Sequence, residues 1–333
     1  MRSYLADFDA TLERRAFGTS DLDVAAGLLE GCCARALAPV DDCLFYHSNV
    51  GMAAGFTLTD GRQVVAKVHG PGQTRARLTA VQRVQGRLAD AGYPCPRPLG
   101  VAHCAHAFVT LEELRTEGVY RDPHEPGVAE TMARALAEQV AIAGTVADVR
   151  ALTREPVRAL PDPWCDTRHT RFDFDGTRDG AGWIDAIAAE ALARLRDDPG
   201  ETVVGHIDWR VEQMRFAGDR ISVAYDWDSL VRDSETTVVG YASRAFPLAW
   251  ERGGTRLWPT PAEQVAFVDA YEETRGRPFS RAERRAIAAA AAFQSAYGAR
   301  CEHAVAEPGE EPPPDSQRAG LAAHGAALFD LLG

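Results

Sequence analysis

The residues with the clearest potential for chemistry are two aspartates, Asp208 and Asp226, which flank a predicted β-hairpin. The segment 203–230 reads VVGHIDWRVEQMRFAGDRISVAYDWDSL, and the turn sequence Ala-Gly-Asp at 217–219 separates its apolar runs. Because the chain reverses at this turn, we expect both carboxylates at the same end of one small β-ribbon. Paired carboxylates suit a hard, oxygen-seeking cation such as Mg²⁺ and can supply a base for a hydroxyl group.

A second unusual residue is Lys67, the only Lys in the chain. All the other members of the 36 Lys and Arg residues are Arg. An Arg-rich and Lys-poor composition is typical of a coding bias, in which Arg replaces Lys wherever only a surface charge is needed. A single retained Lys can instead mark a site that needs a compact ammonium group, since guanidinium is a wide planar fork.

The elements that position Lys67 form a small antiparallel sheet with flanking helices. The Asp60-Gly61 sequence is a strong hairpin signal between two strand-like runs. The predicted elements are, in chain order, a helix over 19–37, strands over 43–47, 52–59 and 62–68, a helix over 74–91, a Pro-rich loop over 93–100 and a strand over 106–111. We place the boundary with the second lobe at residues 112–114.

The elements that position the aspartates belong to a second, mainly helical part of the chain. At roughly 150 residues per domain, a chain of 333 residues also suggests two domains or lobes. The predicted elements are, in chain order, helices over 126–152 and 183–196, an irregular segment over 155–182, β-like runs within 201–231, helices within 234–306 and a last helix over 316–332.

Composition and charge exclude several classes of function. The net charge of -12 argues against sequence-independent binding to nucleic acid or to an anionic membrane. No apolar run approaches the roughly 20 residues of a membrane span, and the N-terminal sequence does not resemble a signal peptide. The seven Cys residues lack CxxC spacing, so we expect no disulfide framework, no zinc site and a cytoplasmic location. The oligomeric state stays open.

The order and spacing of these motifs resemble those of a known family. His-x-Asp at 206–208, followed after a hairpin by Asp-x-Asp at 226–228, resembles the catalytic and metal-binding loops of the aminoglycoside phosphotransferase and choline kinase-like family. The Val-Val-Ala-Lys67 strand is similar to the one that supplies the phosphate-binding Lys of that family, so Lys67 would contact the α- and β-phosphates of a nucleotide. The resemblance covers residues 42–245, and the C-terminal helices only in general character.

The resemblance implies an α+β class, with the two-lobed protein-kinase-like fold of a small antiparallel-sheet N-terminal lobe and a larger, mainly helical C-terminal lobe. Residues 1–113 would form the nucleotide-binding lobe, with an extra N-terminal helix. Residues 114–333 would form the helical lobe, which contains the catalytic hairpin 203–230 and the substrate site. The chain would transfer the γ-phosphate of ATP or GTP to a hydroxyl group of a small molecule, with Mg²⁺ as cofactor.

The resemblance also implies roles for residues of the hairpin. Asp208 would accept or orient the proton of the attacking hydroxyl, and Arg210 would neutralise charge near the γ-phosphate. Asp226 would bind Mg²⁺, and Gln213 stands where the family has a metal-binding Asn. Asp228 would be either a second metal ligand or a brace of the loop.

Neighbouring residues have simpler interpretations. His206 is expected to orient the loop through hydrogen bonds rather than to take part in catalysis. Trp209 and Trp227 are expected to pack rather than to stack on a substrate. Residues 48–51 are assigned to a nucleotide-covering turn by position only, and residues 108–114 to adenine binding on the same basis.

Two departures from the family pattern leave a second hypothesis open. Residues 68–111 contain no Glu, so the helix after the Lys67 strand lacks its usual acidic residue, and Gln82, Gln85 or an acid from elsewhere would have to replace it. Gln213 is longer than Asn by a methylene group, and Mg²⁺ tolerates geometric error poorly. The alternative function is a non-catalytic pseudokinase that binds a nucleotide or a partner.

The sequence leaves the phosphate acceptor open. Acidic residues of the second lobe would suit a cationic acceptor such as an aminoglycoside or an amino-alcohol, although they can equally be solvated surface residues. The residues considered are Asp233, Glu235, Asp269, Glu272 and Glu273.

Overall fold

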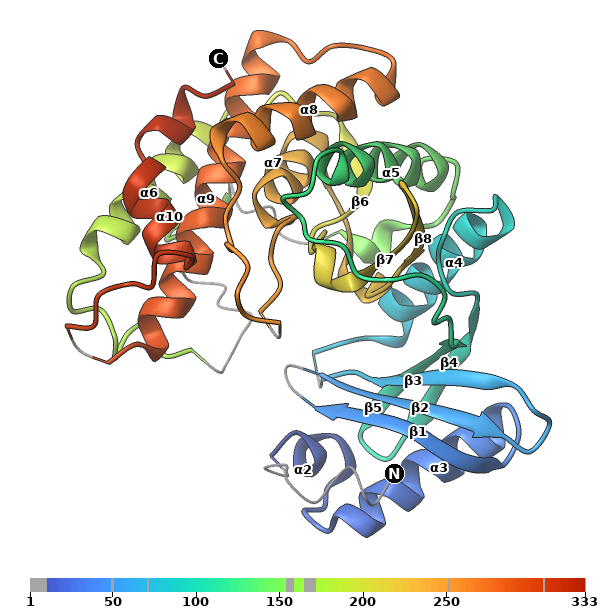
Figure 1. Ribbon diagram of the computed structural model, residues 1–333. Helices are drawn as coiled ribbons and strands as arrows, with labels where there is room; N and C mark the ends of the chain where they lie inside the picture. The colour runs from blue at the N-terminus through green and yellow to red at the C-terminus, as the bar shows by residue number, and fades with distance from the viewer. Residues whose placement is uncertain are drawn as a thin grey trace. The chain divides into compact units, whose positions relative to one another are not determined.

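The chain divides into two structural units, Met1–Thr116 and Glu117–Gly333, which are described separately (Figure 1). The computed structural model describes residues 11–48, 51–70, 72–153, 159–164, 172–250, 252–307 and 309–332. The first unit is built around an antiparallel sheet, and the second is mainly helical. The predicted α+β class is confirmed.

The first unit contains one five-stranded sheet with the strand order β1-β2-β3-β5-β4, and every neighbouring pair is antiparallel. Its elements are α2 (Thr11–Phe17), α3 (Leu22–Ala36), β1 (Val40–Ser48), β2 (Met52–Leu58), β3 (Gln63–Val68), α4 (Arg75–Asp90), β4 (Pro98–Cys104) and β5 (Ala107–Glu113). The four predicted strands and the two predicted helices of this unit are confirmed, with small shifts of their ends.

The sequence wrongly predicts a loop up to residue 100, where the structure has the start of β4. Pro98 is the first residue of this strand, and β4 lies at the edge of the sheet. Proline lacks the N–H group that a central strand needs, but an edge strand tolerates it at its first residue. The Pro-rich composition therefore predicted a loop where the structure has an edge strand.

The helix predicted over 19–37 begins later than its expected cap. Asp21, rather than Thr19 or Ser20, is the N-cap of α3, and its carboxylate accepts hydrogen bonds from the N–H groups of Asp23 and Val24. Carboxylates are among the best N-caps because they satisfy N–H groups of the first turn. The short α2 was not predicted.

The two faces of the sheet carry different residues. Val64, Ala66 and Val68 of β3 point to one face and pack in a buried core with α2 and α3. Because successive side chains of a strand alternate between faces, Lys67 lies on the opposite face. Figure 1 shows α3 and α4 on opposite sides of the sheet, so α4 lies on the Lys67 side.

The second unit contains two short strand pairs among helices. Its elements are α5 (Val128–Ala143), η1 (Arg150–Leu152), α6 (Gly182–Leu195), β6 (Thr202–His206), η3 (Val211–Gln213), β7 (Met214–Ala217), β8 (Arg220–Ala224), η4 (Trp227–Ser229), β9 (Leu230–Ser234), α7 (Glu235–Ala245), α8 (Pro261–Arg275), α9 (Arg281–Val305), α10 (Gln317–His324) and η5 (Ala327–Phe329).

Several predicted helices of this unit are shorter or divided. The helix predicted over 126–152 ends at Ala143, before Gly144. The segment 234–306 is divided into α7, α8 and α9, and the last two begin with capping boxes at Thr260 and Ser280. Such caps satisfy the N–H groups of a helix start and thus allow a new helix to begin after a turn.

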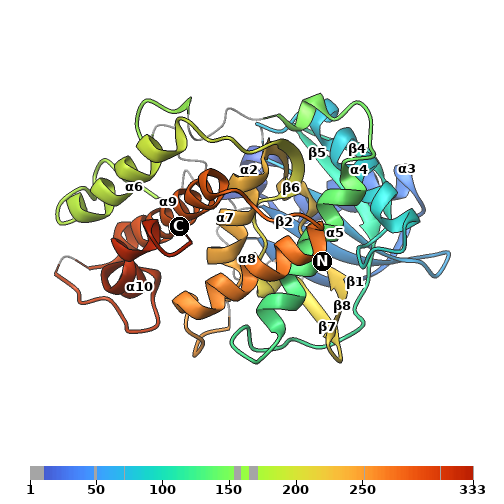
Figure 2. The same cartoon turned by 90° about the horizontal axis from the view of Figure 1, so that it is seen from above.

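The core of the second unit is centred on α7 and α9. Every residue of α7 is buried, and α9 presents a run of buried alanines to it. A Cβ atom at Gly240 of α7 would lie 2.6 Å from the Ile287 carbonyl oxygen, so this glycine permits a close approach of the two helices. Figure 2 shows α6 and α10 beside α9, around the same core.

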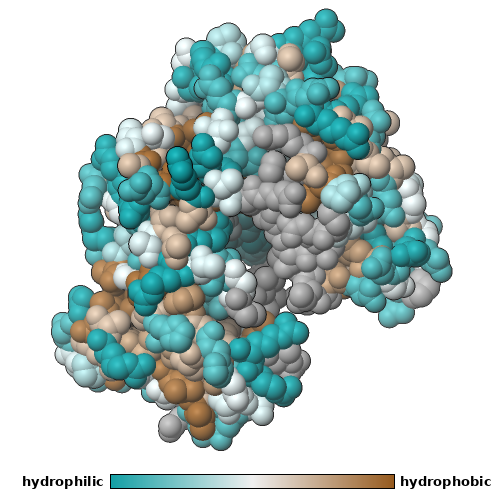
Figure 3. All heavy atoms as spheres, turned by 180° about the vertical axis from the view of Figure 1, so that it is seen from behind, coloured by the Kyte–Doolittle hydropathy of each residue, from teal (hydrophilic) through white to brown (hydrophobic). Residues whose placement is uncertain are grey.

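The face of the molecule shown in Figure 3 carries hydrophilic residues with patches of hydrophobic residues among them. In the parts of the chain described above, no helix combines the length and the apolar character that crossing a membrane requires.

Candidate active site

Two antiparallel strand pairs of the second unit hold the segment that carries the aspartates. β7 pairs with β8 across the predicted turn, which confirms the hairpin. Asp208 follows β6, and Asp226 follows β8. The sequence did not predict that β6 pairs with β9, which begins at Leu230. This second pair joins the two ends of the segment, so the loops that carry Asp208 and Asp226 are attached to the same pair of strands.

Gln213 links the two carboxylates directly. Its Nε2 donates hydrogen bonds to Asp208 Oδ2 at 3.0 Å and to Asp226 Oδ2 at 3.1 Å. Gln213 directly precedes β7, and its carbonyl oxygen accepts a bond from the Tyr225 N–H at 3.0 Å. The hairpin therefore places Gln213 beside Tyr225, the residue that precedes Asp226. The expected approach of the two carboxylates is found, and an amide group lies between them.

Arg210 lies against Asp208 and neutralises part of its charge. The Arg210 Nε lies 2.8 Å from Asp208 Oδ1, and its guanidinium also contacts Glu212 Oε2 at 3.2 Å. Burial lowers the pKa of Arg210, but the charges of Asp208, Asp226 and Glu212 outweigh this effect and raise it overall. Arg210 thus remains charged and restricts the orientation of the Asp208 carboxylate.

Asp226 has a backbone conformation that non-glycine residues seldom adopt. Its φ of 65° and ψ of 41° place it in the left-handed region. The Ser229 hydroxyl donates to Asp226 Oδ2 at 2.9 Å, and the Ser229 N–H donates to the Asp226 carbonyl at 3.0 Å. Such strain persists only where surrounding contacts impose it, and it is concentrated at functional sites.

His206 connects the two aspartate loops from within the core. It is fully buried, its Nδ1 accepts a bond from the Asp208 N–H, and its Nε2 lies 3.3 Å from the Tyr225 carbonyl oxygen. The acceptor role of Nδ1 places the proton of the neutral ring on Nε2. These contacts support the interpretation that His206 orients both loops.

Trp209 and Trp227 are buried and pack beside His206. Each indole is 1% exposed. The Trp209 Nε1 donates to the Met132 carbonyl at 2.9 Å, and the Trp227 Nε1 donates to the Ala224 carbonyl at 2.8 Å. With their polar groups bonded to backbone, both rings stabilise the core, as expected.

We expect the free energy of unfolding to fall as the pH decreases below about 6.5, partly because of His206. Burial lowers the pKa of His206 in the folded protein, although the charges of Asp226 and Asp208 oppose this effect. The unfolded chain therefore binds a proton near pH 6.5 that the folded protein does not bind. Stability is lost from that pH down to the folded pKa, at up to about 1.4 kcal/mol per pH unit.

Urea unfolding at pH 7.5 and 5.5 measures this pH dependence. The difference between the two pH values should be smaller in His206→Gln than in the wild type. His47→Gln is the matched control, since His47 is exposed on β1. An equal pH dependence in both variants would show that His206 is not the group responsible.

The oxygen atoms around Asp226 suit a cation of the Mg²⁺ type. Gln213 Oε1 is buried and has no hydrogen-bond partner among the described side chains and backbone. Mg²⁺ is commonly held through one or two carboxylates together with phosphates and water. Within the described ranges, no cluster of three His, Cys, Asp or Glu residues could hold a metal alone. Asp226 and Gln213 therefore fit a cation that arrives with a nucleotide. Asp228 is half-buried in η4.

Lys67 of β3 has a cross-strand neighbour on each side in the sheet. It is paired in register with Ala53 of β2 and with Thr110 of β5. The Thr110 hydroxyl lies 2.8 Å from His69 Nε2, and both side chains are buried. The strand position predicted for Lys67 is therefore found, with a polar residue opposite it.

The two glutamines proposed as partners for Lys67 hold α4 on the sheet. Gln82 Nε2 donates to the Gly100 carbonyl at 2.8 Å and to the Leu111 carbonyl at 3.1 Å. Gln85 Nε2 donates to Glu112 Oε2 at 2.8 Å. Glu112 was not predicted as a partner, and it lies one residue beyond the segment 68–111, which contains no Glu. The alternation of β5 places Glu112 on one face with Thr110, but its relation to Lys67 depends on the pairing of β5 with β3.

Other predicted site segments are only partly described. Residues 49 and 50 of the nucleotide-covering turn, and residues 154–158 and 165–171 of the irregular segment, lie outside the described residues. In the segment assigned to adenine, the Glu113 N–H donates to the Arg97 carbonyl and the Leu114 N–H donates to the Gln63 carbonyl. These two backbone groups are thus used within the first unit.

Three of the five acidic residues considered for a cationic acceptor take part in internal contacts. Glu235 accepts a bond from the Tyr271 hydroxyl and pairs with Arg275, and both side chains of that ion pair are buried. Asp269 pairs with Arg284 at 3.2 Å, and Glu272 also contacts Arg284. These contacts give those acids structural roles.

Comparisons with known proteins agree with this geometry. A family model described as APH, Phosphotransferase enzyme family, matches residues 55–287. Among curated protein sequences, none matches the chain. Among solved structures, the amicoumacin kinase hAmiN in complex with AMP-PNP, Ca²⁺ and Ami is similar with a TM-score of 0.58 and 11% identity, over 86% of this chain and 88% of that chain.

Two further structures show the same fold. A macrolide 2'-phosphotransferase type I has a TM-score of 0.52 and 18% identity, over 93% of this chain and 97% of that chain. A choline/ethanolamine kinase family protein from Mesorhizobium loti has a TM-score of 0.52 and 17% identity, over 93% and 94% of the two chains. At these identities the likeness is one of fold, and it confirms the kinase-like fold expected from the sequence.

Proposed function

Because the chain belongs to the phosphotransferase enzyme family, we propose that it transfers the γ-phosphate of ATP or GTP to a hydroxyl group of a small molecule. The observation that carries this proposal is the bridge from Gln213 to both Asp208 and Asp226. It holds a base for a hydroxyl and a cation ligand at a fixed separation, as in-line phosphoryl transfer requires.

Each residue of the bridge has a separate task in this mechanism. Asp208 accepts the proton of the acceptor hydroxyl as its oxygen bonds to the γ-phosphorus, and the bond from that phosphorus to the bridging β–γ oxygen breaks to release ADP or GDP. Arg210 orients the Asp208 carboxylate through their ion pair and would neutralise charge near the γ-phosphate. Asp226 and Gln213 Oε1 would hold Mg²⁺, which would withdraw charge from the phosphates. Lys67 would bind the α- and β-phosphates, and Asp228 would brace the loop or supply a second ligand.

The acceptor is proposed from chemistry shared with similar structures. The similar structures include an amicoumacin kinase, a macrolide 2'-phosphotransferase and a choline/ethanolamine kinase family protein, and one aminoglycoside phosphotransferase, APH(4)-Ia, is in complex with ADP and hygromycin B. We therefore propose a hydroxylated small molecule, with aminoglycosides and amino-alcohols as the first candidates. A cytoplasmic location is proposed with it, since the six described cysteines are all free thiols.

We expect Mg²⁺ with ATP or GTP to raise the melting temperature of the protein by several degrees, because a ligand that binds only the folded state stabilises it. A nucleotide-consumption screen over aminoglycosides, amino-alcohols, sugars and macrolides then identifies the acceptor, and mass spectrometry confirms the phosphorylated product. Nucleotide binding without any product across this panel would favour the pseudokinase. No stabilisation by either nucleotide would contradict both functions.

A further inference from the structure

The only Lys of the chain needs an acidic partner that α4 does not supply. The usual kinase arrangement pairs the strand Lys with a Glu on the following helix. The only carboxylate of α4 is that of Asp90, its last residue, which pairs with Arg97 at 2.7 Å. Any acidic partner of Lys67 must therefore come from another element.

The strand register places Glu112 on the same face as Lys67. In the pairing of β3 with β5, Lys67 is opposite Thr110 and Val65 is opposite Glu112. Residues directly opposite in an antiparallel pair point to the same face, so Lys67 and Glu112 are diagonal neighbours. Such neighbours lie about 7–8 Å apart at Cα, which long side chains span.

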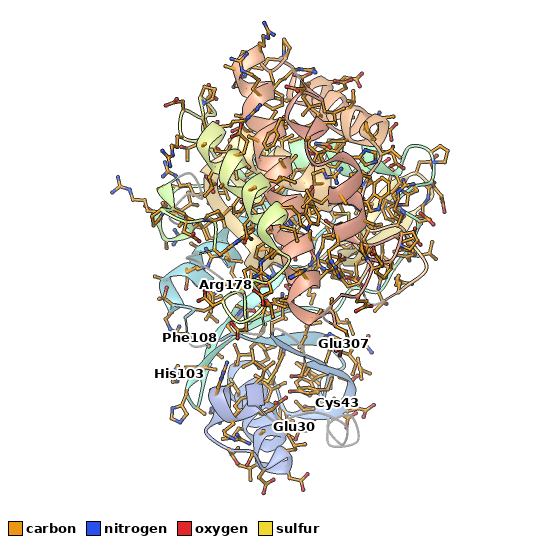
Figure 4. The ribbon with its side chains drawn as sticks, turned by 90° about the vertical axis from the view of Figure 1, so that its left-hand side faces the viewer. Glu30, Cys43, His103, Phe108, Arg178 and Glu307 are labelled. Atoms are coloured by element: carbon orange, nitrogen blue, oxygen red, sulfur yellow. The ribbon has the colours of Figure 1, made fainter. Side chains whose placement is uncertain are left out.

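The helix α4 lies along this face and reaches Glu112. Arg75, at the start of α4, lies over the Phe108 ring, with 5.7 Å from its Cζ to the ring centroid. Figure 4 shows Phe108 close to His103, at the edge of the sheet formed by β4 and β5, and the two rings are 5.2 Å apart. Ten residues further along the helix, Gln85 donates its hydrogen bond to Glu112.

Glu112 has the surroundings of a fixed carboxylate. It is 7% exposed, and Gln85, which is 2% exposed, donates to its Oε2 at 2.8 Å and to the Pro96 carbonyl at 2.9 Å. A buried carboxylate is stable only with hydrogen bonds and a nearby cation. Lys67 is a diagonal neighbour of Glu112 in the sheet, and Arg115, three residues further along the chain, donates to the Cys95 carbonyl at 3.1 Å.

We propose that Glu112 of β5 is the acidic partner that positions Lys67, and that Gln85 of α4 holds its carboxylate in place. The role in nucleotide binding rests on the proposed function, whereas the pairing itself does not. Both charged residues lie on adjacent strands of one sheet, so the pair does not depend on a carboxylate carried by the helix. Gln85 takes the place of the helix Glu and acts through a hydrogen bond.

The single Lys makes a direct test simple. Full-length, tag-free protein labelled with ¹³Cε-lysine gives one side-chain signal, whose pH titration reports the pKa of Lys67. A neighbouring carboxylate favours the ammonium form, so Glu112→Gln should lower this pKa by roughly one pH unit or more. Glu113→Gln is the matched control, because Glu113 is the next residue, exposed and on the other face. An unchanged pKa of Lys67 in Glu112→Gln overturns the proposal and indicates that Glu112 pairs with Arg115 instead.

A charge relocation tests the role of the pair. The double variant Gln85→Glu with Glu112→Gln keeps a Glu–Gln hydrogen bond but moves the carboxylate onto α4. Glu112→Gln alone should raise the KM for ATP about tenfold, as expected for the loss of one charged contact, and the double variant should recover part of this loss. Lack of recovery, with melting temperatures equal to that of the wild type, contradicts the positioning role. If the wild type binds no nucleotide, the proposed function fails while the titration still decides the pairing.

Discussion

The Asp208→Asn variant is expected to lose phosphate transfer, with kcat lower by about 10²- to 10⁴-fold. The amide cannot accept a proton from the acceptor hydroxyl. It also presents an NH₂ group either to Gln213 Nε2 or to Arg210, both of which contact the native carboxylate. Mg²⁺ with ATP should still raise the melting temperature, since Asp208 is assigned to the hydroxyl and not to the nucleotide. Single-turnover kinetics and thermal unfolding measure the two effects.

The matched control for this variant is Asp219→Asn in the turn of the same hairpin. Asp219 has a side chain that is 96% exposed and pairs with Arg121 at 3.1 Å. An exposed ion pair contributes little to stability, so this change should leave kcat and the melting temperature close to those of the wild type. Wild-type turnover in Asp208→Asn on an identified acceptor would mean that another group accepts the proton.

The parts of the site that follow from local pattern could be predicted from the sequence. A turn between two apolar runs brings the residues on either side together, so Asp208 and Asp226 were expected at one end of a ribbon, and the hairpin confirms it. The strand position of Lys67 follows in the same way from the Asp60-Gly61 turn. Both inferences need only the reversal of the chain, which few residues determine.

The parts that depend on long-range pairing could not be predicted. Gln213 was expected as a metal ligand, but its bond to both carboxylates depends on the register of β7 with β8. β4 was missed because only its place at the sheet edge makes Pro98 acceptable. Glu112 was missed because its relation to Lys67 exists only once β5 lies beside β3. In each case tertiary contacts, rather than local propensity, set the position.

The Asp226→Asn variant is expected to lose the part of nucleotide binding that depends on the metal, and to lower kcat on the order of 10³-fold. Asparagine tolerates the left-handed backbone that Asp226 adopts at φ 65°, whereas alanine would add strain there. Its carbonyl oxygen can still accept the Ser229 hydroxyl. The change therefore removes the negative charge of residue 226 and preserves the backbone conformation of its loop. Thermal shifts with ATP, measured with Mg²⁺ and with chelator, separate the metal-dependent stabilisation.

The variant Asp228→Asn completes this test, because Asp228 lies two residues further on, in the short helix η4 that Asp226 precedes. If Asp228 is a second ligand, its variant should also lose the difference between the shifts with Mg²⁺ and with chelator. If it only braces the loop, that difference should persist while the melting temperature of the protein without nucleotide falls. Equal metal-dependent shifts in Asp226→Asn and the wild type would exclude Asp226 as the ligand. Because binding is the readout, this outcome holds for an active kinase and for a pseudokinase alike.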